Sequence, residues 1–280
     1  MHSVETITGL RRFVAEWRRQ DDTVAFVPTM GNLHDGHLEL VRRARSAADR
    51  VVVSIYVNPL QFNDENDFTG YPRTPEADRD KLAAAQTDLL YLPEHNELYP
   101  FGLEDSVRVH VPGLSDILCG AFRPGHFDGV STIVIKLFNA VQPDMALFGN
   151  KDYQQLLLIR RMTRDLCLPI DIIGVETVRE QDGLAMSSRN HYLTAAQRRQ
   201  AAVLYRQLEQ VRAEVIRGRR DFDALQQQTM RELDRQGMQA EYCEIRRCED
   251  LAVPEADDSE LIVLAAAWLG PARLIDNLAI

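Results

Sequence analysis

The sequence predicts an α/β protein in which a parallel sheet forms a first, larger domain and a smaller α+β domain follows. Two apolar runs, residues 24–29 and 51–57, flank a segment in which apolar residues recur at helical spacing. Both runs have the length of a strand, and the second is rich in β-branched residues, as is typical of parallel strands covered on both faces. A strand, a helix and a second strand in this order predict a βαβ unit.

The other elements are expected in chain order around this unit. An amphipathic helix over residues 3–20 precedes it. Further strands of the first domain are expected at residues 88–92, 107–111, 145–148 and 170–175, and its helices at residues 75–85 and 130–141. The smaller domain is expected to contain helices at residues 194–217 and 222–236 and strands at residues 241–246 and 261–268. We therefore place the two domains at residues 1–178 and 179–280.

Composition limits the class of protein. The chain has 280 residues, of which 45% are apolar, which is enough for a sizeable core. No apolar run approaches the ~20 residues of a membrane helix, and the N-terminus has no apolar or basic leader, so we expect a cytoplasmic protein without membrane contact. The four cysteines lack paired metal spacing and are expected to be reduced thiols. A net charge of −10 argues against a nucleic-acid partner.

The loop between the first two predicted strands is the most informative segment about function. Residues 30–37 contain Gly31 and Gly36 together with two histidines, His34 and His37. The start of a helix offers unpaired N–H groups and a partial positive charge, glycines let a phosphate approach the backbone, and histidines can donate to phosphate oxygens. The loop therefore predicts a nucleotide site. A helix cap formed by a histidine, or half of a metal site, is the alternative interpretation.

Polar residues also follow other predicted strands. Asn58 and Gln61 come after residues 51–57, and Lys151 and Gln155 come after the strand that ends at residue 148. Since the carboxyl ends of parallel strands meet at one edge of a sheet, these side chains are expected at the edge that carries the histidines. An amide can hold a hydroxyl or a carboxylate, and a lysine can contact a phosphate. A solvated loop residue is the alternative for each.

Three further segments supply candidate residues. Arg123 lies in a glycine-containing turn before a helix, which fits a second helix start aimed at an anion. The hydroxyls of Ser187 and Ser188 and the guanidinium of Arg189 can wrap a triphosphate. Asp78, in the first turn of the helix at residues 75–85, could face a metal-bound phosphate, or it could simply complement the helix dipole.

The ordered set of these motifs resembles the pantothenate synthetase family, a branch of the nucleotidyltransferase superfamily with the His-x-Gly-His signature. The resemblance spans nearly the whole chain and rests on residues 28–37, 57–62, 71–74, 123–127, 151–155, 186–190, 265–270 and 272–277. One departure is Asn150, where the family usually has a glutamate before Lys-Asp.

The resemblance implies a fold and a reaction. The expected fold is a Rossmann-like nucleotide-binding domain with a smaller C-terminal α+β domain that carries the Met-Ser-Ser-Arg loop. The family joins (R)-pantoate to β-alanine with ATP, through a pantoyl adenylate, and releases AMP and pyrophosphate. Mg2+ accompanies ATP, and family members form homodimers in the cytoplasm.

Matching the motifs residue by residue also implies roles. His37 would be the proton donor, and His34, Lys151 and Arg189 would join it in neutralising the leaving pyrophosphate. Gln61 and Gln155 would bind pantoate, with Gln61 also near β-alanine, and Asp78 matches the acid expected near Mg2+. We add Asn58 and Arg123 as substrate-binding candidates. The residues implied to bind ATP are Met30, Gly31, Asn32, Leu33, His34, Asp35, Gly36, His37, Gly149, Asn150, Lys151, Asp152, Val178, Met186, Ser187, Ser188 and Arg189.

Two other functions share part of this pattern. Nucleotidyltransferases that build dinucleotide cofactors carry the same histidine signature, but their product keeps the AMP. A non-catalytic nucleotide-binding module would keep the glycine loops without needing Lys151. Release of free AMP only when pantoate and β-alanine are both present separates the three.

Overall fold

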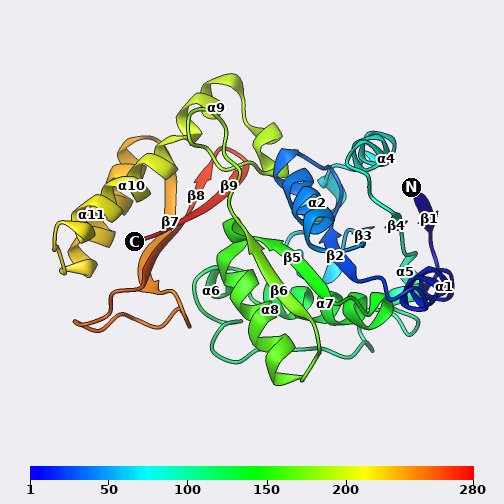
Figure 1. Ribbon diagram of the computed structural model, residues 1–280. Helices are drawn as coiled ribbons and strands as arrows, with labels where there is room; N and C mark the ends of the chain where they lie inside the picture. Colours follow the sequence, from blue (N-terminus) through cyan, green and yellow to red (C-terminus); the bar gives the residue numbers. More distant parts are fainter. The chain divides into compact units, whose positions relative to one another are not determined.

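The computed structural model describes residues 1–280 and divides the chain into two compact units (Figure 1). The first unit consists of Met1–Asn150 and Gln155–Glu176, and the second consists of Lys151–Gln154 and Thr177–Ile280. By its contacts, the short segment with Lys151 thus groups with the C-terminal part of the chain. The domain boundary that we place after residue 178 stays a prediction.

The first unit is built on a six-stranded sheet in which all neighbouring strands pair in parallel. The strand order is β1-β4-β3-β2-β5-β6. The order reverses between β2 and β5, and open α/β sheets bind ligands at the carboxyl ends of strands beside such a reversal. The strands are β1 (His2–Val4), β2 (Val24–Thr29), β3 (Arg50–Ile55), β4 (Leu89–Tyr91), β5 (Met145–Gly149) and β6 (Asp171–Val175).

Helices cover both faces of this sheet, because successive residues of a buried strand point to opposite sides. On one face, Val27 of β2 packs in a core with Leu40 of α2 and Leu82 of α4. On the other face, Phe26 packs edge-on against Phe138 of α7, with ring centroids 6.4 Å apart. The helices that lie between β1 and β6 in the chain are α1 (Ile7–Arg18), α2 (Asp35–Ala47), η1 (Pro59–Gln61), α3 (Glu65–Gly70), α4 (Pro75–Ala84), α5 (His95–Leu98), α6 (Cys119–Phe122), α7 (His126–Val141), η2 (Asn150–Asp152) and α8 (Tyr153–Asp165).

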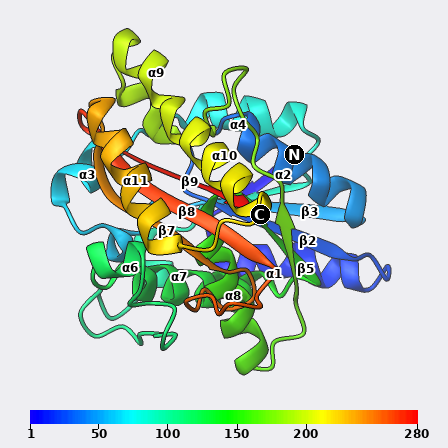
Figure 2. The same cartoon turned by 90° about the vertical axis from the view of Figure 1, so that its left-hand side faces the viewer.

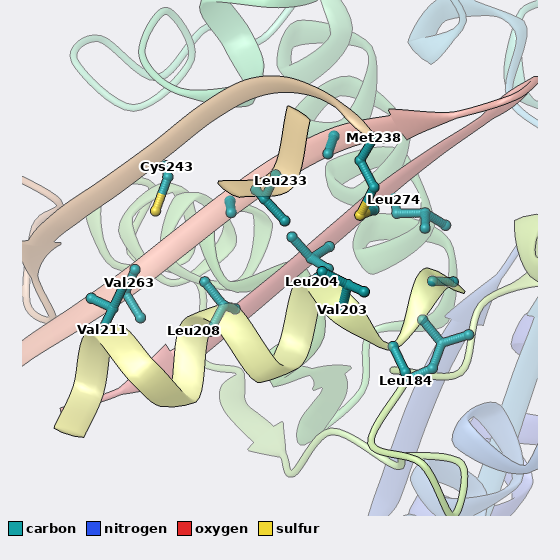
Figure 3. Close-up of a cluster of buried hydrophobic side chains, with 14 of the residues drawn as sticks. Leu184, Val203, Leu204, Leu208, Val211, Leu233, Met238, Cys243, Val263 and Leu274 are labelled. Atoms are coloured by element: carbon teal, nitrogen blue, oxygen red, sulfur yellow. The ribbon is translucent and has the colours of Figure 1, made fainter. Parts of the chain in front are cut away.

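The second unit contains a three-stranded antiparallel sheet in the order β7-β8-β9. Helices α10 and α11 pack on this sheet (Figure 2). Leu204 and Leu208 of α10, Leu233 of α11 and Val263 of β8 belong to the buried cluster between them (Figure 3). The elements are η3 (Ser188–Tyr192), α9 (Ala195–Ala201), α10 (Val203–Ile216), α11 (Phe222–Arg235), β7 (Gln239–Arg247), β8 (Leu261–Leu269) and β9 (Ala272–Ala279).

The predicted fold class is confirmed, and most predicted elements occur with bounds shifted by a few residues. The edge strand expected at residues 107–111 is wrong: that segment is irregular, Val107 is 77% exposed, and β1 is the strand that pairs with β4. The single helix expected at residues 194–217 is also wrong, because it is interrupted at Ala202, where ψ is −11°. Strands β1 and β9 were not predicted. No helix is both long and apolar enough to cross a membrane.

We expect Leu208→Ala to lower the free energy of unfolding of the second unit by about 2–5 kcal/mol, because Leu208 is fully buried in the cluster of Figure 3. The two tryptophans of the chain, Trp17 and Trp268, lie in different units. In a Trp17→Phe background, urea unfolding followed by fluorescence therefore reports on the second unit. Ile216→Ala is the control, because Ile216 is the last residue of the same helix and is 65% exposed. A loss no larger than that of the control would contradict this packing.

Candidate active site

The loop after β2 makes a tight turn through two residues with left-handed backbone angles. Gly31 has φ +81° and Asn32 has φ +49°. A Cβ atom on Gly31 would lie 3.0 Å from Ile55 Cγ2 and 3.1 Å from Asp78 Oδ2. Both the backbone angle and the close approach therefore favour glycine here. Residues 30–32 thus form the tight turn that leads from β2 towards α2.

Helix α4 holds this turn from the side. Asp78 Oδ2 accepts the N–H of Asn32 at 2.8 Å, and Oδ1 accepts the N–H of Leu33 at 2.8 Å. Lys81, one turn further along α4, donates from Nζ to the carbonyl of Leu33 at 2.6 Å. Both backbone groups of Leu33 are therefore bonded to side chains of one helix.

Asp78 is also the acid that the family resemblance places near Mg2+. The residue is 1% exposed, and each of its carboxylate oxygens accepts from a backbone donor. No group of three or more His, Cys, Asp or Glu side chains in the chain could hold a metal ion. Asp78 therefore braces the loop. Since each carboxylate oxygen can accept a second partner, its contact with Mg2+ stays a prediction.

His34 and His37 together cap the N-terminus of α2. His34, the N-cap residue, accepts the N–H of Gly36 at Nδ1 at 3.1 Å, and His37 accepts the N–H of His34 at Nδ1 at 3.3 Å. This is a capping box in which histidines replace the usual Ser or Thr and Glu or Gln. Because a backbone N–H can only donate, both Nδ1 atoms are unprotonated, and each neutral ring carries its proton on Nε2.

This geometry bears on the two interpretations of the histidines. The capping role considered as an alternative is present. It also fixes the tautomer, so that any contact of either ring with a phosphate would use an Nε2–H donor. The ring centroids of His34 and His37 are 4.1 Å apart. The cap and the predicted phosphate role therefore use opposite nitrogens of the same rings.

Gln61 lies beside the first residue of this loop. Its Nε2 is 3.1 Å from Met30 Sδ. Asn58, which is 1% exposed, donates from Nδ2 to Gln61 Oε1 at 3.2 Å and to Gly129 O at 3.0 Å, and it accepts the Tyr99 hydroxyl at 2.7 Å. All the polar atoms of the Asn58 amide are thus engaged within the protein, and its contact with a substrate stays a prediction.

The backbone of Gln61 is held by two side chains at the start of α7. Its carbonyl accepts from Arg123 Nη2 at 3.1 Å and from His126 Nδ1 at 2.7 Å. Arg123 Nη1 lies 3.2 Å from His126 Nε2. Since a guanidinium only donates, Nε2 accepts, and His126 is neutral with its proton on Nδ1. Arg123 therefore fixes the backbone of Gln61. Its contact with substrate stays a prediction.

Other candidates of the first unit lie near strand ends or helix starts. Gly149 is the last residue of β5, and Asn150 donates from Nδ2 to Glu176 Oε1 at 3.0 Å. A carboxylate at position 150 would meet the carboxylate of Glu176, whereas asparagine supplies a donor. Asp35 is in the first turn of α2, and Gln155 is half-buried in the first turn of α8.

In the second unit, a small cavity is lined by three of the polar loop residues and by Asp276. These loop residues are Lys151, Ser187 and Asn190. Asn277 donates from Nδ2 to the carbonyl of Lys151 at 2.8 Å, and Asp152 lies 3.9 Å from Lys151 Nζ. Ser187 Oγ accepts the N–H of Arg189 at 3.2 Å and caps η3, which begins at Ser188. The remaining lining residues are Leu184, Ala185, Leu204, Leu274 and Ile275.

A buried ion pair braces the segment before this loop. Arg179 makes two hydrogen bonds to Asp276, at 2.6 and 2.9 Å, and donates to Gly183 O at 3.0 Å. The Arg179 and Asp276 side chains are 18% and 2% exposed. Met186 donates from its N–H to Val178 O at 3.0 Å, so these two ATP candidates are neighbours. The loop that carries Ser187 thus begins from a closed, anchored turn.

Comparison with known proteins identifies the family of this chain. The family model described as pantoate-beta-alanine ligase matches residues 2–279. The chain belongs to the pantoate–β-alanine ligase family. Two curated relatives are each called pantothenate synthetase. The protein from Methylococcus capsulatus is 54% identical and that from Thioalkalivibrio sulfidiphilus is 52% identical, and both alignments cover 100% of this chain and 98% of the relative.

Solved structures of the pantoate–β-alanine ligase family have the same fold. Pantothenate synthetase from Thermus thermophilus is 44% identical, with a TM-score of 0.91 and 99% of both chains covered. The ligase from Francisella tularensis, described as complexed with beta-gamma ATP and β-alanine, is 32% identical. Its TM-score is 0.84, with 100% of this chain and 97% of that chain covered. The family expected from the motifs is confirmed.

We expect Asp78→Asn to raise the KM for ATP about tenfold, because the new amide nitrogen cannot accept one of the two backbone N–H groups. Initial rates at several ATP concentrations, measured at low and high Mg2+, test this. Asp80→Asn, an exposed change on the same helix, is the control. Recovery of the parent KM at high Mg2+ would instead favour a metal-binding role for Asp78.

Proposed function

We propose that the chain ligates (R)-pantoate and β-alanine to pantothenate with ATP and releases AMP and pyrophosphate. The observation that carries this proposal is family membership over residues 2–279. It is supported by the name shared by the relatives and by the beta-gamma ATP and β-alanine bound to the Francisella tularensis protein.

The reaction proceeds in two steps. A carboxylate oxygen of pantoate attacks the α-phosphorus of ATP, and the bond from this phosphorus to the bridging oxygen breaks, which releases pyrophosphate. The amine of β-alanine then attacks the acyl carbon of pantoyl adenylate, AMP leaves, and the nitrogen loses a proton. Neither step needs a protein nucleophile. Each needs two reactants held in line and a charged leaving group neutralised.

In the first unit, the loop over residues 30–37 binds ATP. The N-terminus of α2 contributes the partial positive charge of its unpaired N–H groups. His34 and His37 donate from Nε2 as charge develops on the phosphate oxygens, and His37 is the proton donor. Gly31 lets a phosphate approach the backbone closely.

In the second unit, Lys151 and the loop with Ser187, Ser188 and Arg189 bind the phosphates of ATP through charge-assisted hydrogen bonds. The anchored turn that joins Val178 to Met186 fixes where this loop begins. Further ATP contacts are assigned to Gly149, Asn150, Asp152, Val178 and Met186.

Pantoate is held by the amides of Gln61 and Gln155, and the position of Gln61 next to Met30 supports this assignment. A neutral amide pair suits a small hydroxy acid, since an amide can both donate and accept.

We further propose that ATP is used as its Mg2+ complex, in which the cation offsets phosphate charge. Asp78, whose oxygens also accept the N–H groups of Asn32 and Leu33, is the acid expected near this ion. A homodimer in the cytoplasm is proposed from the family resemblance alone.

The test of this function is a product analysis with purified protein, ATP and Mg2+. We expect equal amounts of pantothenate and AMP, and no AMP when pantoate or β-alanine is omitted. Pantoate alone should support exchange of labelled pyrophosphate into ATP, because adenylation precedes amine attack. A dinucleotide product would favour a cofactor-building enzyme, and absence of exchange in an active enzyme would favour a concerted reaction.

We expect His37→Gln to slow adenylation by about 100-fold or more, since a preorganised donor to developing charge is lost. Its melting temperature should stay near that of the parent, because glutamine is a usual residue at this capping position. His37→Ala, which removes the cap as well, is the matched variant and should also melt earlier. Thermal melts and pyrophosphate exchange measure both effects. Near-parent exchange in His37→Gln would show that the ring nitrogen is dispensable.

A further inference from the structure

A chain of hydrogen bonds within the first unit ends at the side chain of Gln61. The Tyr99 hydroxyl donates to Asn58 Oδ1 at 2.7 Å, and Asn58 Nδ2 donates to Gln61 Oε1 at 3.2 Å. Tyr99 and Asn58 are each only 1% exposed. Neither residue is therefore positioned like a side chain that meets substrate from solvent.

The direction of this chain is fixed by the carbonyl of Gly129. The oxygen and nitrogen of an amide have nearly the same shape, so their placement must follow from their partners. A carbonyl oxygen only accepts, and the Asn58 atom 3.0 Å from Gly129 O must therefore be Nδ2. The second N–H of this nitrogen points to Gln61, where it needs an acceptor, and the facing atom is therefore Oε1.

Gly129 reaches Asn58 because helix α7 packs backbone to backbone against η1. A Cβ atom on Gly129 would lie 2.4 Å from Leu60 O and 2.7 Å from Gln61 N, which is closer than real atoms approach. A side chain at this position would force the helix away and would remove its carbonyl from Asn58. The same helix start holds the Gln61 carbonyl through Arg123 and His126.

Tyr99 supplies the other end of the chain. A phenol is protonated at neutral pH, and burial, with a smaller effect of the nearby Tyr56, raises the pKa of Tyr99 still further, so its hydroxyl is a donor. The ring stacks on His95, with centroids 5.2 Å apart, and Lys136 Nζ lies 4.9 Å from the ring centroid. Its hydroxyl thus donates to Asn58 Oδ1, and the two N–H groups of Asn58 donate to Gly129 O and Gln61 Oε1.

We infer that Tyr99 and Asn58 are positioning residues that turn the amide of Gln61 so that its N–H groups, and not its carbonyl, face the bound acid. The inference rests on the proposed function, because it takes pantoate as that acid. The partner of Gln61 Nε2 in this structure is Met30 Sδ, a weak acceptor that an oxygen of the acid can replace. Gln61 then binds carboxylate or hydroxyl oxygens and rejects an ammonium group.

The sharpest variant is Asn58→Asp, which keeps the shape of the side chain but removes its N–H groups. The carboxylate can only accept, so Gln61 must turn over and donate to it, which leaves Oε1 facing the acid. We expect the KM for pantoate to rise about tenfold or more and the KM for ATP to change less than about twofold.

A second, milder variant covers the case in which Asn58→Asp does not fold. Tyr99→Phe keeps the ring and removes only the hydroxyl that bonds Asn58, and we expect it to raise the KM for pantoate about fivefold. The matched control is Tyr56→Phe. Its ring lies 6.4 Å from that of Tyr99, but its hydroxyl contacts His95 Nδ1, so the KM for pantoate should stay near that of the parent.

A double-mutant cycle shows whether these residues act through Gln61. In a Gln61→Ala background, Tyr99→Phe and Asn58→Asp should have no further effect on the KM for pantoate, because the amide that they orient is gone. Effects that simply multiply would overturn the inference, as would equal shifts in Tyr99→Phe and Tyr56→Phe. Either of these two results would be measured in variants that still make pantothenate, so it would leave the proposed function intact. A parent chain that makes none overturns the proposed function, and this inference with it.

Discussion

Two backbone N–H groups that converge on one buried carboxylate fix the loop on which the candidate site depends. Asp78 is 1% exposed, and a carboxylate at such a position is tolerated only when its oxygens are bonded. The N–H groups of Asn32 and Leu33 donate those bonds, and the same bonds hold the turn through Gly31 in one conformation. The N-terminus of α2, which begins three residues after Asn32, is thereby aimed from the carboxyl end of β2. A loop that became ordered only on binding would bind its ligand more weakly, because the ordering costs conformational entropy.

The same principle recurs in the other loops, where charged and polar side chains bond to backbone more than to one another. The two histidines bond the N–H groups of their own helix, Arg123 and His126 bond the carbonyl of Gln61, and Asn277 bonds that of Lys151. A backbone group held in this way fixes the position of the side chain that it carries. The residues assigned to chemistry are thus supported by neighbours that need not touch a substrate, as preorganised sites require.

The features that can be predicted from the sequence are those determined by residues close together in the chain. The apolar period around β2, α2 and β3 and the loop motifs were sufficient for the fold class and for the family. β1 is only three residues long, which is too short for periodicity to reveal it. It is β1, and not residues 107–111, that pairs with β4. The supporting contacts join residues far apart in the chain. Tyr99 is 41 residues from Asn58, Gly129 is 71 residues from Asn58, and Asp276 is 97 residues from Arg179. A single sequence carries no signal for such pairs.

The chemistry beside Met30 also bears on which of the nucleotide-using functions fits this chain. An enzyme that joins two nucleotides must hold a second phosphate, for which arginine or lysine is the suitable partner. Here the group next to Met30 is the neutral side-chain amide of Gln61, which Asn58 and Tyr99 orient. The nearby guanidinium of Arg123 is bonded to the Gln61 carbonyl. A neutral donor of fixed direction matches a hydroxyl or carboxylate oxygen of a small acid, and an analogue without that oxygen would leave the amide unpaired. The orientation of one amide thus favours a hydroxy acid over a second nucleotide as the partner of ATP.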